Sequence, residues 1–298
     1  MTRYRLVAEH RAQWGVEERC RVLQVSRSVA AASSPRAEQT QRLETTIKEL
    51  FEASQRRSGS PKITRELTKR GWRVSKNRVP RRMRLPGLRS IVRRRFRVTT
   101  NSKHRYPVAP DRLQRNFTAQ RPNQVWVSDI TYLRVGCGWL YLAVFIDLYS
   151  RPVVGWALSS SLDPTLVLTA RPRAVALRRP PRGLIIHSDR GVQYACSSFV
   201  EGVSQRGFVQ SMSRKGDCWD NAVAESFFHL LKTEVTYHCR WLNDQAAYRS
   251  LFEYIEIFYN RERSHSTLDY VSPDQFDTSP QSPLEGVRFP GGVSGSTQ

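Results

Sequence analysis

Three acidic residues lie in surroundings where a charge is costly to desolvate. Asp129 lies in the β-rich run WVSDITY, Asp189 follows an apolar run, and Glu225 lies among Ala and Phe in AVAESFFHLL. Each of them alone is more often a helix cap or a surface charge. Together, on elements that a fold can bring to one point, they are typical of a site for Mg²⁺, which prefers hard oxygen ligands. Crowded carboxylates without a cation repel one another, so at least one pKa is expected to be raised.

Phosphoryl transfer is the chemistry that these ligands suit. Two Mg²⁺ ions about 3.5–4 Å apart activate the attacking oxygen and stabilise the leaving oxygen, with little covalent help from the protein. Asp129 is the expected bridging ligand, and Asp189 and Glu225 are each expected to hold one ion. General-base catalysis by His187, which neighbours Asp189, is the rival interpretation. A histidine beside a strand end is as often structural, so we place it behind the carboxylates.

The order of the predicted elements indicates how these residues are positioned. Alternating apolar residues predict a strand over 124–135, and two more β-rich runs follow at 139–146 and 152–158. The later elements, in chain order, are a helix from Asp163-Pro164 to about Arg178, a strand at 183–187, a helix at about 197–205, a strand near 208–211, the helix of Glu225 and a long amphipathic helix over 243–259. This order resembles the ribonuclease-H-like fold, an α/β class with a mixed five-stranded sheet flanked by helices.

The formal net charge of +22 is concentrated in the first 121 residues. This part holds 31 Lys and Arg against nine Asp and Glu, whereas residues 122–298 hold 17 of each sign. A merely soluble surface rarely needs so strong a local excess. Basic surfaces bind phosphate by displacing condensed counterions, so the asymmetry favours nucleic acid as the partner.

A helix-turn-helix pattern lies within this basic part. Ile63 and Leu67 lie on one face of a helix that Gly71 stops, and Ser75 is expected to start a second helix. This all-α arrangement, with basic side chains on the second element, has the shape of a helix-turn-helix DNA reader. The alternative is any small basic helical domain. The candidate DNA contacts are Lys76, Arg78, Arg81 and Arg82.

Composition argues against several classes of protein. The longest uninterrupted apolar run, from Trp139 to Ile146, has eight residues, whereas a membrane span takes about 20. The first residues lack the apolar core and cleavage site of a secretion signal. Five scattered cysteines without a CxxC pair argue against a zinc ribbon or a disulfide framework. A reducing cytoplasm fits, with no membrane partner.

Five stretches of the chain carry a recognisable pattern: WVSDITY (126–132), FIDLYSRPVVGWAL (145–158), HSDRGVQY (187–194), SMSRKGDCWDNAVAESFFHLLKTE (211–234) and YNRERSHSTLDYVSP (259–273). Together they resemble the catalytic core of insertion-sequence transposases, in particular the OrfB-type product of the IS-three family, which shares its core with retroviral integrases. Thirty-five residues separate Asp189 from Glu225, as in the family's DD(35)E pattern. Lys232, seven positions or about two helical turns after Glu225, matches the family's DNA-contacting basic residue. The resemblance covers about residues 45–278.

The resemblance implies a DNA transposase that recombines DNA in two steps. Water attacks a phosphodiester at the end of the element and frees a 3′-hydroxyl, which then attacks a target phosphodiester in line. The implied cofactors are two Mg²⁺ ions per active site, with Mn²⁺ as a substitute. The implied partners are terminal inverted repeats, target DNA, further copies of the chain on DNA, and an upstream-frame (OrfA-type) product. Arg190 and Lys215 are further candidates for contacts to phosphate, and a bacterial cytoplasm, at the nucleoid, is the implied location.

The chain is expected to have six parts. In order, they are a small helical segment (1–35), a helix-turn-helix-like DNA-binding region (38–100), a basic linker (101–121), a ribonuclease-H-like integrase catalytic core (122–240), a C-terminal helical extension of the core (241–278) and a flexible tail (279–298). Near the site, Asp220 and Asn221 are expected to cap the helix of Glu225. The C-terminal signature is expected to make packing contacts rather than take part in catalysis.

Three residues depart from the family's pattern. Pro172 falls eight residues inside the helix expected from Pro164, where a proline typically costs about 3 kcal/mol or kinks the helix. Pro80 interrupts the expected second helix of the DNA reader, and Asp269 stands where the family usually has glycine. These residues favour an alternative function, a catalytically weak or degenerate copy that acts only as a sequence-specific DNA-binding protein. A nuclease without strand transfer is a third option, although it would not need basic N-terminal modules.

Overall fold

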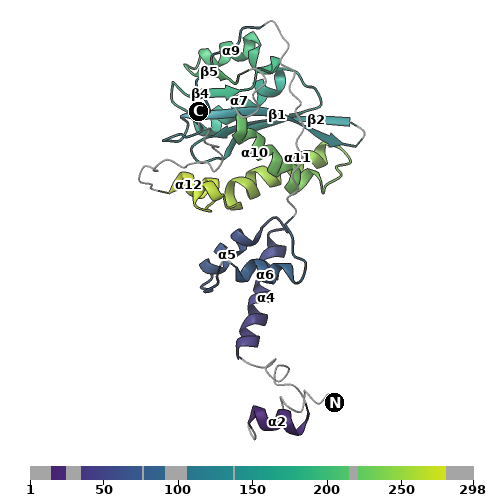
Figure 1. The fold of residues 1–298 in the computed structure, drawn as a ribbon. Coiled ribbons are helices and arrows are strands. Elements are labelled where there is room, and N and C mark those ends of the chain that lie inside the picture. The colour runs from purple at the N-terminus through teal and green to yellow at the C-terminus, as the bar shows by residue number, and fades with distance from the viewer. Residues whose placement is uncertain are drawn as a thin grey trace, which may run out of the picture. The chain divides into compact units, whose positions relative to one another are not determined.

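The computed structural model describes residues 15–24, 35–75, 77–90, 106–136, 138–214 and 221–279 of the chain (Figure 1). The chain divides into two compact units, Met1–Ile91 and Val92–Gln298, and each has its own hydrophobic core. Within the described ranges, no helix is long and apolar enough to cross a lipid bilayer.

The described part of the first unit is all-α. Its elements are α2 (Val16–Val22), α4 (Pro35–Ala53), α5 (Ser60–Lys69) and α6 (Arg78–Arg84). The last three helices enclose a small core built from residues at helical spacing: Leu43, Ile47, Leu50, Phe51, Ile63, Leu67, Val79 and Met83. The prediction that Ile63 and Leu67 share one buried face is confirmed.

The turn after α5 depends on a glycine. Gly71 has a φ of +83°, which glycine adopts without steric cost. The N–H groups of Gly71 and Trp72 donate to the carbonyls of Thr68 and Leu67, both at 3.0 Å. These two bonds form a Schellman motif, and they end the helix where the sequence predicted.

The second helix of this pair, α6, starts later than the sequence predicted. Its first residue is Arg78, and Ser75 lies in the preceding turn, where its carbonyl accepts the Arg78 N–H. Pro80 is therefore the third residue of the helix. Because N–H groups of the first turn have no acceptor within a helix, a proline here removes no helical hydrogen bond. The expectation that Pro80 interrupts this helix is wrong.

The second unit is built on a five-stranded mixed sheet in the order β3-β2-β1-β4-β5. The strands are β1 (Val125–Val135), β2 (Gly138–Asp147), β3 (Val153–Ser159), β4 (Ile185–Ser188) and β5 (Val209–Met212). β1, β2 and β3 pair antiparallel, whereas β4 runs parallel to β1, and β5 runs parallel to β4. This topology is that of the predicted ribonuclease-H-like fold.

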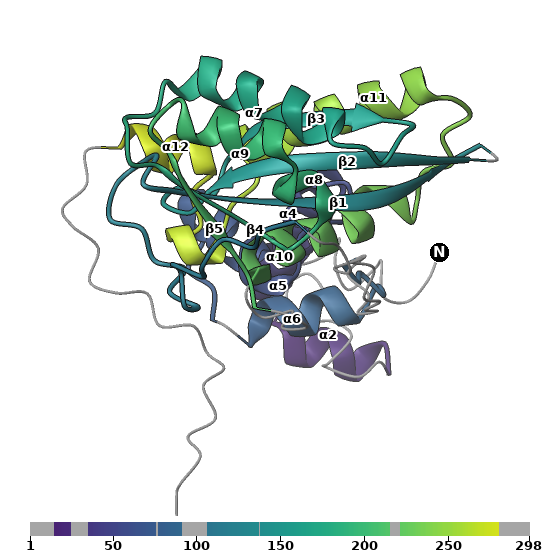
Figure 2. The same ribbon diagram turned by 90° about the horizontal axis from the view of Figure 1, so that it is seen from above.

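Helices cover both faces of the sheet, with α7 and α9 on one side and α10 on the other (Figure 2). The helices of the first face are α7 (Thr165–Arg178), α8 (Val192–Ala195) and α9 (Ser197–Ser204). The other core contains residues of α10 (Ala222–Leu231) and α11 (Asp244–Phe252). Because side chains alternate along a strand, Trp126 of β1 joins the first core, and Val125 and Val127 join the second. Asp129 follows Val125 and Val127 in this alternation, so its side chain lies on the same face of the sheet as theirs.

The proline inside α7 does not break the helix. α7 runs without interruption through Pro172, whose side chain is exposed to solvent. The carbonyl of Leu168 loses its usual N–H partner, but this residue is only half-buried. One missing hydrogen bond near the solvent side leaves the helix intact, so Pro172 gives no reason to infer a damaged core.

The position where the family usually has glycine does require a left-handed backbone. Asp269 has a φ of +52° and a ψ of +30°, at the end of the short 3₁₀ helix η5 (Ser266–Leu268). Asp is several-fold enriched in this region relative to other non-glycine residues. Tyr270, the next residue, also has a positive φ of +60°, so the turn is made by two residues without glycine.

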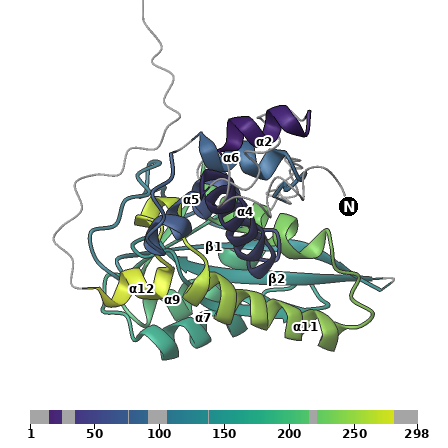
Figure 3. The same ribbon diagram turned by 90° about the horizontal axis from the view of Figure 1, so that it is seen from below.

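The C-terminal segment runs along the sheet from α11 to α12 (Pro273–Thr278) (Figures 1 and 3). Within the described ranges, two stretches are π-helical: η3 (Lys232–Thr236), which continues α10, and η4 (Glu253–Glu262), which continues α11. Asn260 of η4 ties the segment to the sheet, because its amide donates to the Val153 carbonyl and accepts the Val153 N–H. The prediction that the C-terminal signature makes packing contacts is confirmed at Asn260.

Candidate active site

Neighbouring strands bring Asp129 and Asp189 to one face of the sheet. In the parallel ladder of β1 and β4, Val127 pairs with His187. Asp129 on β1 and Asp189, which directly follows β4, each lie two residues beyond this last pair. Strands in a sheet lie about 4.8 Å apart, so side chains at equal register are neighbours. The Asp189 carboxylate also accepts the N–H of Gly191 at 3.0 Å, which restrains its orientation.

The helix α10 carries Glu225 over the same face. It buries four apolar residues in the core to which Val127 belongs: Ala224, Phe227, Phe228 and Leu231. Glu225 itself is half-buried, at the rim of this apolar stripe. A carboxylate stands among apolar residues here because the helix must pack on β1, the strand of Asp129.

The charges of the three acidic residues act on one another at Asp129. Burial raises the pKa of Asp129 well above its ordinary value, and the negative charges of Asp189 and Glu225 raise it further. The N–H of Ile130, which donates to the Asp129 carboxylate at 2.8 Å, opposes this shift. Burial alone raises the pKa of Glu225. Asp129 is thus the central carboxylate, and Asp189 acts on it more strongly than Glu225 does.

Lys232 lies within electrostatic reach of the same carboxylate. It begins η3, directly after α10, and its side chain is half-buried. Burial lowers the pKa of Lys232, and the charge of Asp129 partly offsets that effect. The amine therefore adds positive charge to the acidic site, in addition to the DNA contact that the sequence predicts and that stays a prediction.

The donor set suits a hard divalent cation. Three carboxylate side chains offer only oxygen ligands, and a bound cation would relieve the repulsion that raises the pKa of Asp129. Among the described residues, no three acidic, histidine or cysteine side chains converge closely enough to hold one ion. Asp129 instead interacts with each of the other two, as a bridging ligand would. Metal ligation by the three residues stays a prediction.

A fourth buried acid, Asp147, belongs to the framework of the fold. It ends β2, and its two carboxylate oxygens accept the N–H groups of Asn123 at 2.8 Å and Tyr149 at 3.0 Å. The guanidinium of Arg178 lies 3.4 Å from one of these oxygens. Because protein donors already occupy both oxygens, Asp147 is not a candidate ligand.

The arginines of α6 face two directions. Arg82 forms an ion pair with Glu44 at 2.8 Å, and Arg78, one turn earlier, donates to the Thr40 hydroxyl at 3.3 Å. Both partners lie on α4, so these two arginines help to pack the helices together. The side chain of Arg81 is exposed, whereas those of Arg78 and Arg82 are half-buried. Of these three predicted DNA contacts, Arg81 has the most accessible charge.

The other polar candidates are placed as follows. Arg190 donates through Nε to the Ser213 carbonyl at 2.7 Å, at the edge of the acidic site. His187 is fully buried, and its Nδ1 shares a hydrogen bond of 2.9 Å with the Ser211 hydroxyl, which supports a structural role. Two predicted DNA contacts lie outside the described residues: Lys76 and Lys215.

Sequence reasoning missed a pair of hydrogen bonds centred on Ser128. Asn221 occupies the N-cap position of α10 without capping it, and its Nδ2 instead donates to the Ser128 carbonyl at 3.2 Å. The prediction that Asn221 caps this helix is wrong, and Asp220 lies outside the described residues. The Ser128 hydroxyl shares a hydrogen bond of 2.9 Å with the Tyr194 hydroxyl. The one feature of the sequence that could have indicated these hydrogen bonds is a serine in the apolar first half of β1.

Sequence reasoning also missed a buried ion pair that joins η3 to the end of η4. Glu234 and Arg263 approach to 2.9 Å, with side chains only 2% and 8% exposed. The Tyr254 hydroxyl donates to the second Glu234 oxygen at 2.8 Å, and Arg263 Nε lies 3.2 Å from it. The pair thereby links the C-terminal segment to the helix that carries Glu225. Its two members are 29 positions apart in the sequence, so no local sequence pattern predicts the ion pair.

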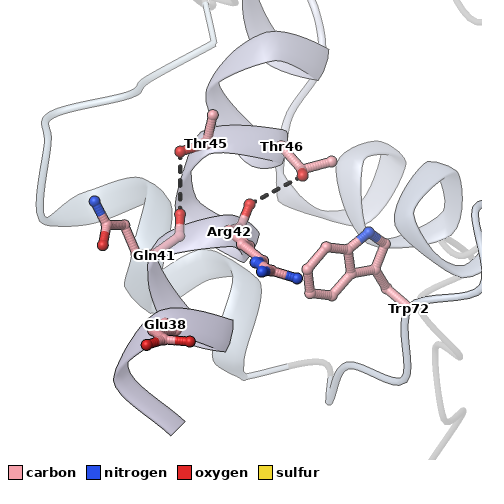
Figure 4. A pocket seen from close by; sticks show the side chains of 6 residues that line it. All are labelled: Glu38, Gln41, Arg42, Thr45, Thr46 and Trp72. Carbon is pink, nitrogen blue, oxygen red and sulfur yellow. Dashed lines mark hydrogen bonds between the residues drawn. The ribbon is translucent and has the colours of Figure 1, made fainter. Parts of the chain in front are cut away.

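An open groove of about 530 Å³ lies in the first unit (Figure 4). It is lined by Glu38, Gln41, Arg42, Thr45, Thr46 and Trp72. The two threonine hydroxyls donate to carbonyls of α4, and the Arg42 side chain points toward the Trp72 ring (Figure 4). With one acidic and one basic residue in its lining, the groove has no charge preference that would identify a ligand.

The comparisons with known proteins agree with both units. An HTH-like domain model matches residues 38–96, and integrase core domain models match residues 119–218 and 225–279. The chain is 37% identical over 282 residues to the transposase InsF for insertion sequence IS3A of Escherichia coli strain K12, which covers 92% of this chain and 98% of the relative. It is 42% identical over 262 residues to a 31 kDa protein of insertion element IS600 of Shigella sonnei, which covers 86% of this chain and 96% of the relative.

Solved structures show a weaker likeness. The intasome of simian T-cell lymphotropic virus in complex with PP2A regulatory subunit B56 gamma has a TM-score of 0.47 at 17% identity, covering 83% of this chain and 80% of that chain. The HTLV-2 integrase catalytic core domain in complex with magnesium has a TM-score of 0.43 at 18% identity, covering 54% of this chain and 99% of that chain. At these TM-scores the likeness adds nothing to the sheet topology. Because identity of 37% extends over almost the whole length of both chains, this protein belongs to the insertion-sequence transposases of the IS3 family, enzymes of DNA transposition with an integrase core.

Proposed function

We propose that Asp129, Asp189 and Glu225 form the active site at which this transposase cleaves the ends of its insertion sequence and joins them to target DNA. One observation carries the proposal: the charges of Asp189 and Glu225, from two other segments of the fold, both act on the carboxylate of the half-buried Asp129. Like charges that converge on one carboxylate repel one another, and a bound cation relieves that repulsion. Their convergence favours a site that receives positive charge from outside.

Asp129 would bridge two divalent cations, Mg²⁺ or in its place Mn²⁺, with Asp189 and Glu225 each holding one. When bound, such ions supply a more acidic attacking hydroxyl and stabilise the leaving oxygen. In the first reaction, the oxygen of water bonds to phosphorus, and the bond from phosphorus to the 3′-oxygen breaks. In the second, that 3′-hydroxyl bonds to a target phosphorus and displaces another 3′-oxygen, so the number of phosphodiester bonds is kept.

The basic side chains near the site would hold the DNA during these steps. Lys232 is half-buried within reach of Asp129, so its ammonium is suited to a phosphate beside the reacting group. Arg190 is held by the Ser213 carbonyl at the edge of the acidic site, and its positive charge would attract a second phosphate. Lys215 is a further candidate. In the first unit, Lys76, Arg78, Arg81 and Arg82 would contact DNA, with Arg81 the most accessible.

The division of labour along the chain follows from these assignments. Residues 38–100 would bind the terminal inverted repeats, residues 101–121 would link them to the core, and residues 122–278 would carry the chemistry. We assign residues 1–35 and 279–298 no part in catalysis. Copies of the chain would assemble on DNA, together with an upstream-frame product, in the bacterial cytoplasm at the nucleoid.

The test uses the full chain, labelled DNA ends with their terminal repeats, and Mg²⁺ or Mn²⁺. Wild type should nick the ends and join them to target DNA, whereas Asp189→Asn should bind the ends and leave them intact. Asp244→Asn, at an exposed position that begins α11, is the matched control and should react like wild type. If Asp189→Asn reacted as fast as wild type, the assignment of the site would be wrong.

A further inference from the structure

Ser128 lies at a crossing of hydrogen bonds inside the core. Its hydroxyl is bonded to the Tyr194 hydroxyl at 2.9 Å, and its carbonyl accepts Nδ2 of Asn221 at 3.2 Å. All three residues are buried: Ser128 is 0%, Tyr194 1% and Asn221 5% exposed. The two partners approach β1 from elements that are far apart in the sequence, α8 and the start of α10.

The two bonds hold β1 from different sides. Along β1, Ser128 alternates with Asp129, so its side chain points to the face where Tyr194 belongs to the core. Its carbonyl points toward β4, as the carbonyl of Gln124 does when it accepts the N–H of Ile185. The paired part of β1 and β4 ends at Val127, so this carbonyl has no ladder partner. The Asn221 amide takes the place that a further residue of β4 would have filled.

Each partner lies close along the chain to one of the other acidic residues. Tyr194 is five residues after Asp189, and Asn221 is four residues, or about one helical turn, before Glu225. Ser128 directly precedes Asp129. A single residue therefore connects β1 to the segment that follows Asp189 and to the start of the helix that carries Glu225.

The connection is kept at an energetic cost. Within the described part of the chain, the Oδ1 atom of Asn221 is buried and has no hydrogen-bond partner. Leaving a buried acceptor unsatisfied costs about 1–3 kcal/mol. The Nδ2 donation of Asn221 to Ser128 is the contact that the position gains in exchange.

We infer that Ser128, held by Tyr194 and Asn221, is a positioning residue that sets the spacing of Asp129, Asp189 and Glu225. The inference rests on the proposed function, because the spacing matters only if these carboxylates share divalent cations. Ser128 acts through the backbone: the Tyr194 bond fixes β1 relative to the segment after Asp189, and the Asn221 bond fixes β1 relative to α10. Groups that orient metal ligands typically change metal affinity or activity by about 10- to 100-fold when removed.

Ser128→Ala and Tyr194→Phe each remove the same hydroxyl contact with little change in shape. Each should raise the Mn²⁺ dissociation constant about tenfold and lower kcat to a similar extent, with KM for DNA unchanged. The double variant should be no worse than either single one, because both remove one bond. Asn221→Ala should add a further loss, since it removes a different bond.

Ser150→Ala is the matched structural control. Ser150 is likewise 0% exposed, and its hydroxyl donates to Asp277 at 2.7 Å, outside the acidic site. Losing one such bond should lower the Tm by about 3 °C in either serine variant. The control should keep the Mn²⁺ affinity and kcat of wild type, so the two variants separate positioning from general stability.

The experiment measures Mn²⁺ binding by titration calorimetry, Tm, and cleavage kinetics for the full-length proteins. Weakened Mn²⁺ binding in Ser128→Ala and Tyr194→Phe, with unchanged binding in Ser150→Ala, is the supporting result. If wild type binds Mn²⁺ and cleaves DNA while these two variants do so equally well, the inference is overturned and the proposed function stands. If wild type neither binds Mn²⁺ nor cleaves, the proposed function fails and this inference fails with it. Equal losses in Ser150→Ala would also overturn it, because the effect would then be one of stability.

Discussion

Replacing Arg263 with methionine should destabilise the core far more than the loss of a surface charge does. The substitution keeps an extended side chain but leaves Glu234, whose side chain is 2% exposed, without its counter-charge. Removing one partner of a buried ion pair typically costs about 3–5 kcal/mol. For a unit of this size, about 1 kcal/mol shifts the Tm by roughly 2–4 °C, so a fall of about 10 °C is expected.

The remaining carboxylate explains the magnitude, and a second substitution tests that explanation. Glu234→Gln removes the charge and keeps an oxygen that can accept the Tyr254 hydroxyl. In the double variant Glu234→Gln/Arg263→Met, neither charge is buried alone. The double variant should therefore be less destabilised than the sum of the two single variants, with a coupling of about 1–3 kcal/mol.

The assay is equilibrium unfolding in urea, followed by the circular dichroism of the full chain. Arg261→Met is the matched control, because Arg261 pairs with Asp274 at 3.8 Å through side chains that are 68% and 48% exposed. Exposed pairs contribute about 0–1 kcal/mol, so this variant should remain close to wild type. The reasoning is refuted if Arg263→Met is as mild as Arg261→Met, or if the two substitutions at the buried pair are additive.

Three further predictions follow from the site and from the packing of the two units. Burial and neighbouring charges raise the pKa of Asp129, so the folded protein holds the proton of this carboxyl more tightly than the unfolded chain does, and the stability of the metal-free protein should fall as pH rises above the ordinary pKa of 3.8. Thermal melts at several pH values should show a weaker fall for Asp129→Asn, and an equal slope of Tm against pH would contradict the assignment. Gly155→Ala should lower the stability of the core by about 1–3 kcal/mol, because the added Cβ would lie 2.5 Å from the Cβ of Ala174 and 2.8 Å from the carbonyl oxygen of Ala170, both on α7. Gly138→Ala is the control and should be nearly neutral in the same melts, because its added Cβ would meet nothing closer than 3.9 Å. Arg81→Ala should weaken DNA binding and reduce the slope of log affinity against log salt concentration by about 1, without changing Tm. Arg82→Ala breaks the ion pair with Glu44 of α4, so it should also lower the Tm of the helical unit. Equal salt slopes in wild type and Arg81→Ala would remove Arg81 from the DNA interface.

The sequence predicted the strands along the chain and the candidate site through different kinds of signal. Alternation in β1 and the apolar run before Asp189 come from burial, which is local to each strand, so these elements were found. The helix start at Arg78 was missed because Ser75 is a good capping residue whose role was overridden by the turn that follows it. Local propensity gives way to tertiary packing at such positions.

Contacts over long sequence distances were beyond pattern reading. Asn221 has the residue type and position of a cap, but its amide donates to the carbonyl of Ser128, 93 residues away. The ion pair of Glu234 and Arg263 could not be predicted either, because its two residues are also far apart in the sequence. The π-helical form of η4 was also missed, since its residues have the amphipathic spacing of an ordinary helix. Proline effects were overestimated because the cost of Pro172 depends on solvent exposure, which composition does not reveal.

The position of α10 after all five strands has a consequence for synthesis. A nascent chain that has emerged as far as Met212 contains every strand, but the β1 face with Val127 and Leu133 lacks the helix that covers it. Until Phe227 and its neighbours emerge from the ribosome, this apolar surface is open to chaperones and to other nascent chains. With the active site proposed above, a product that ends before Glu225 would carry only two of the three acidic residues, and it should leave the ribosome unable to cut DNA.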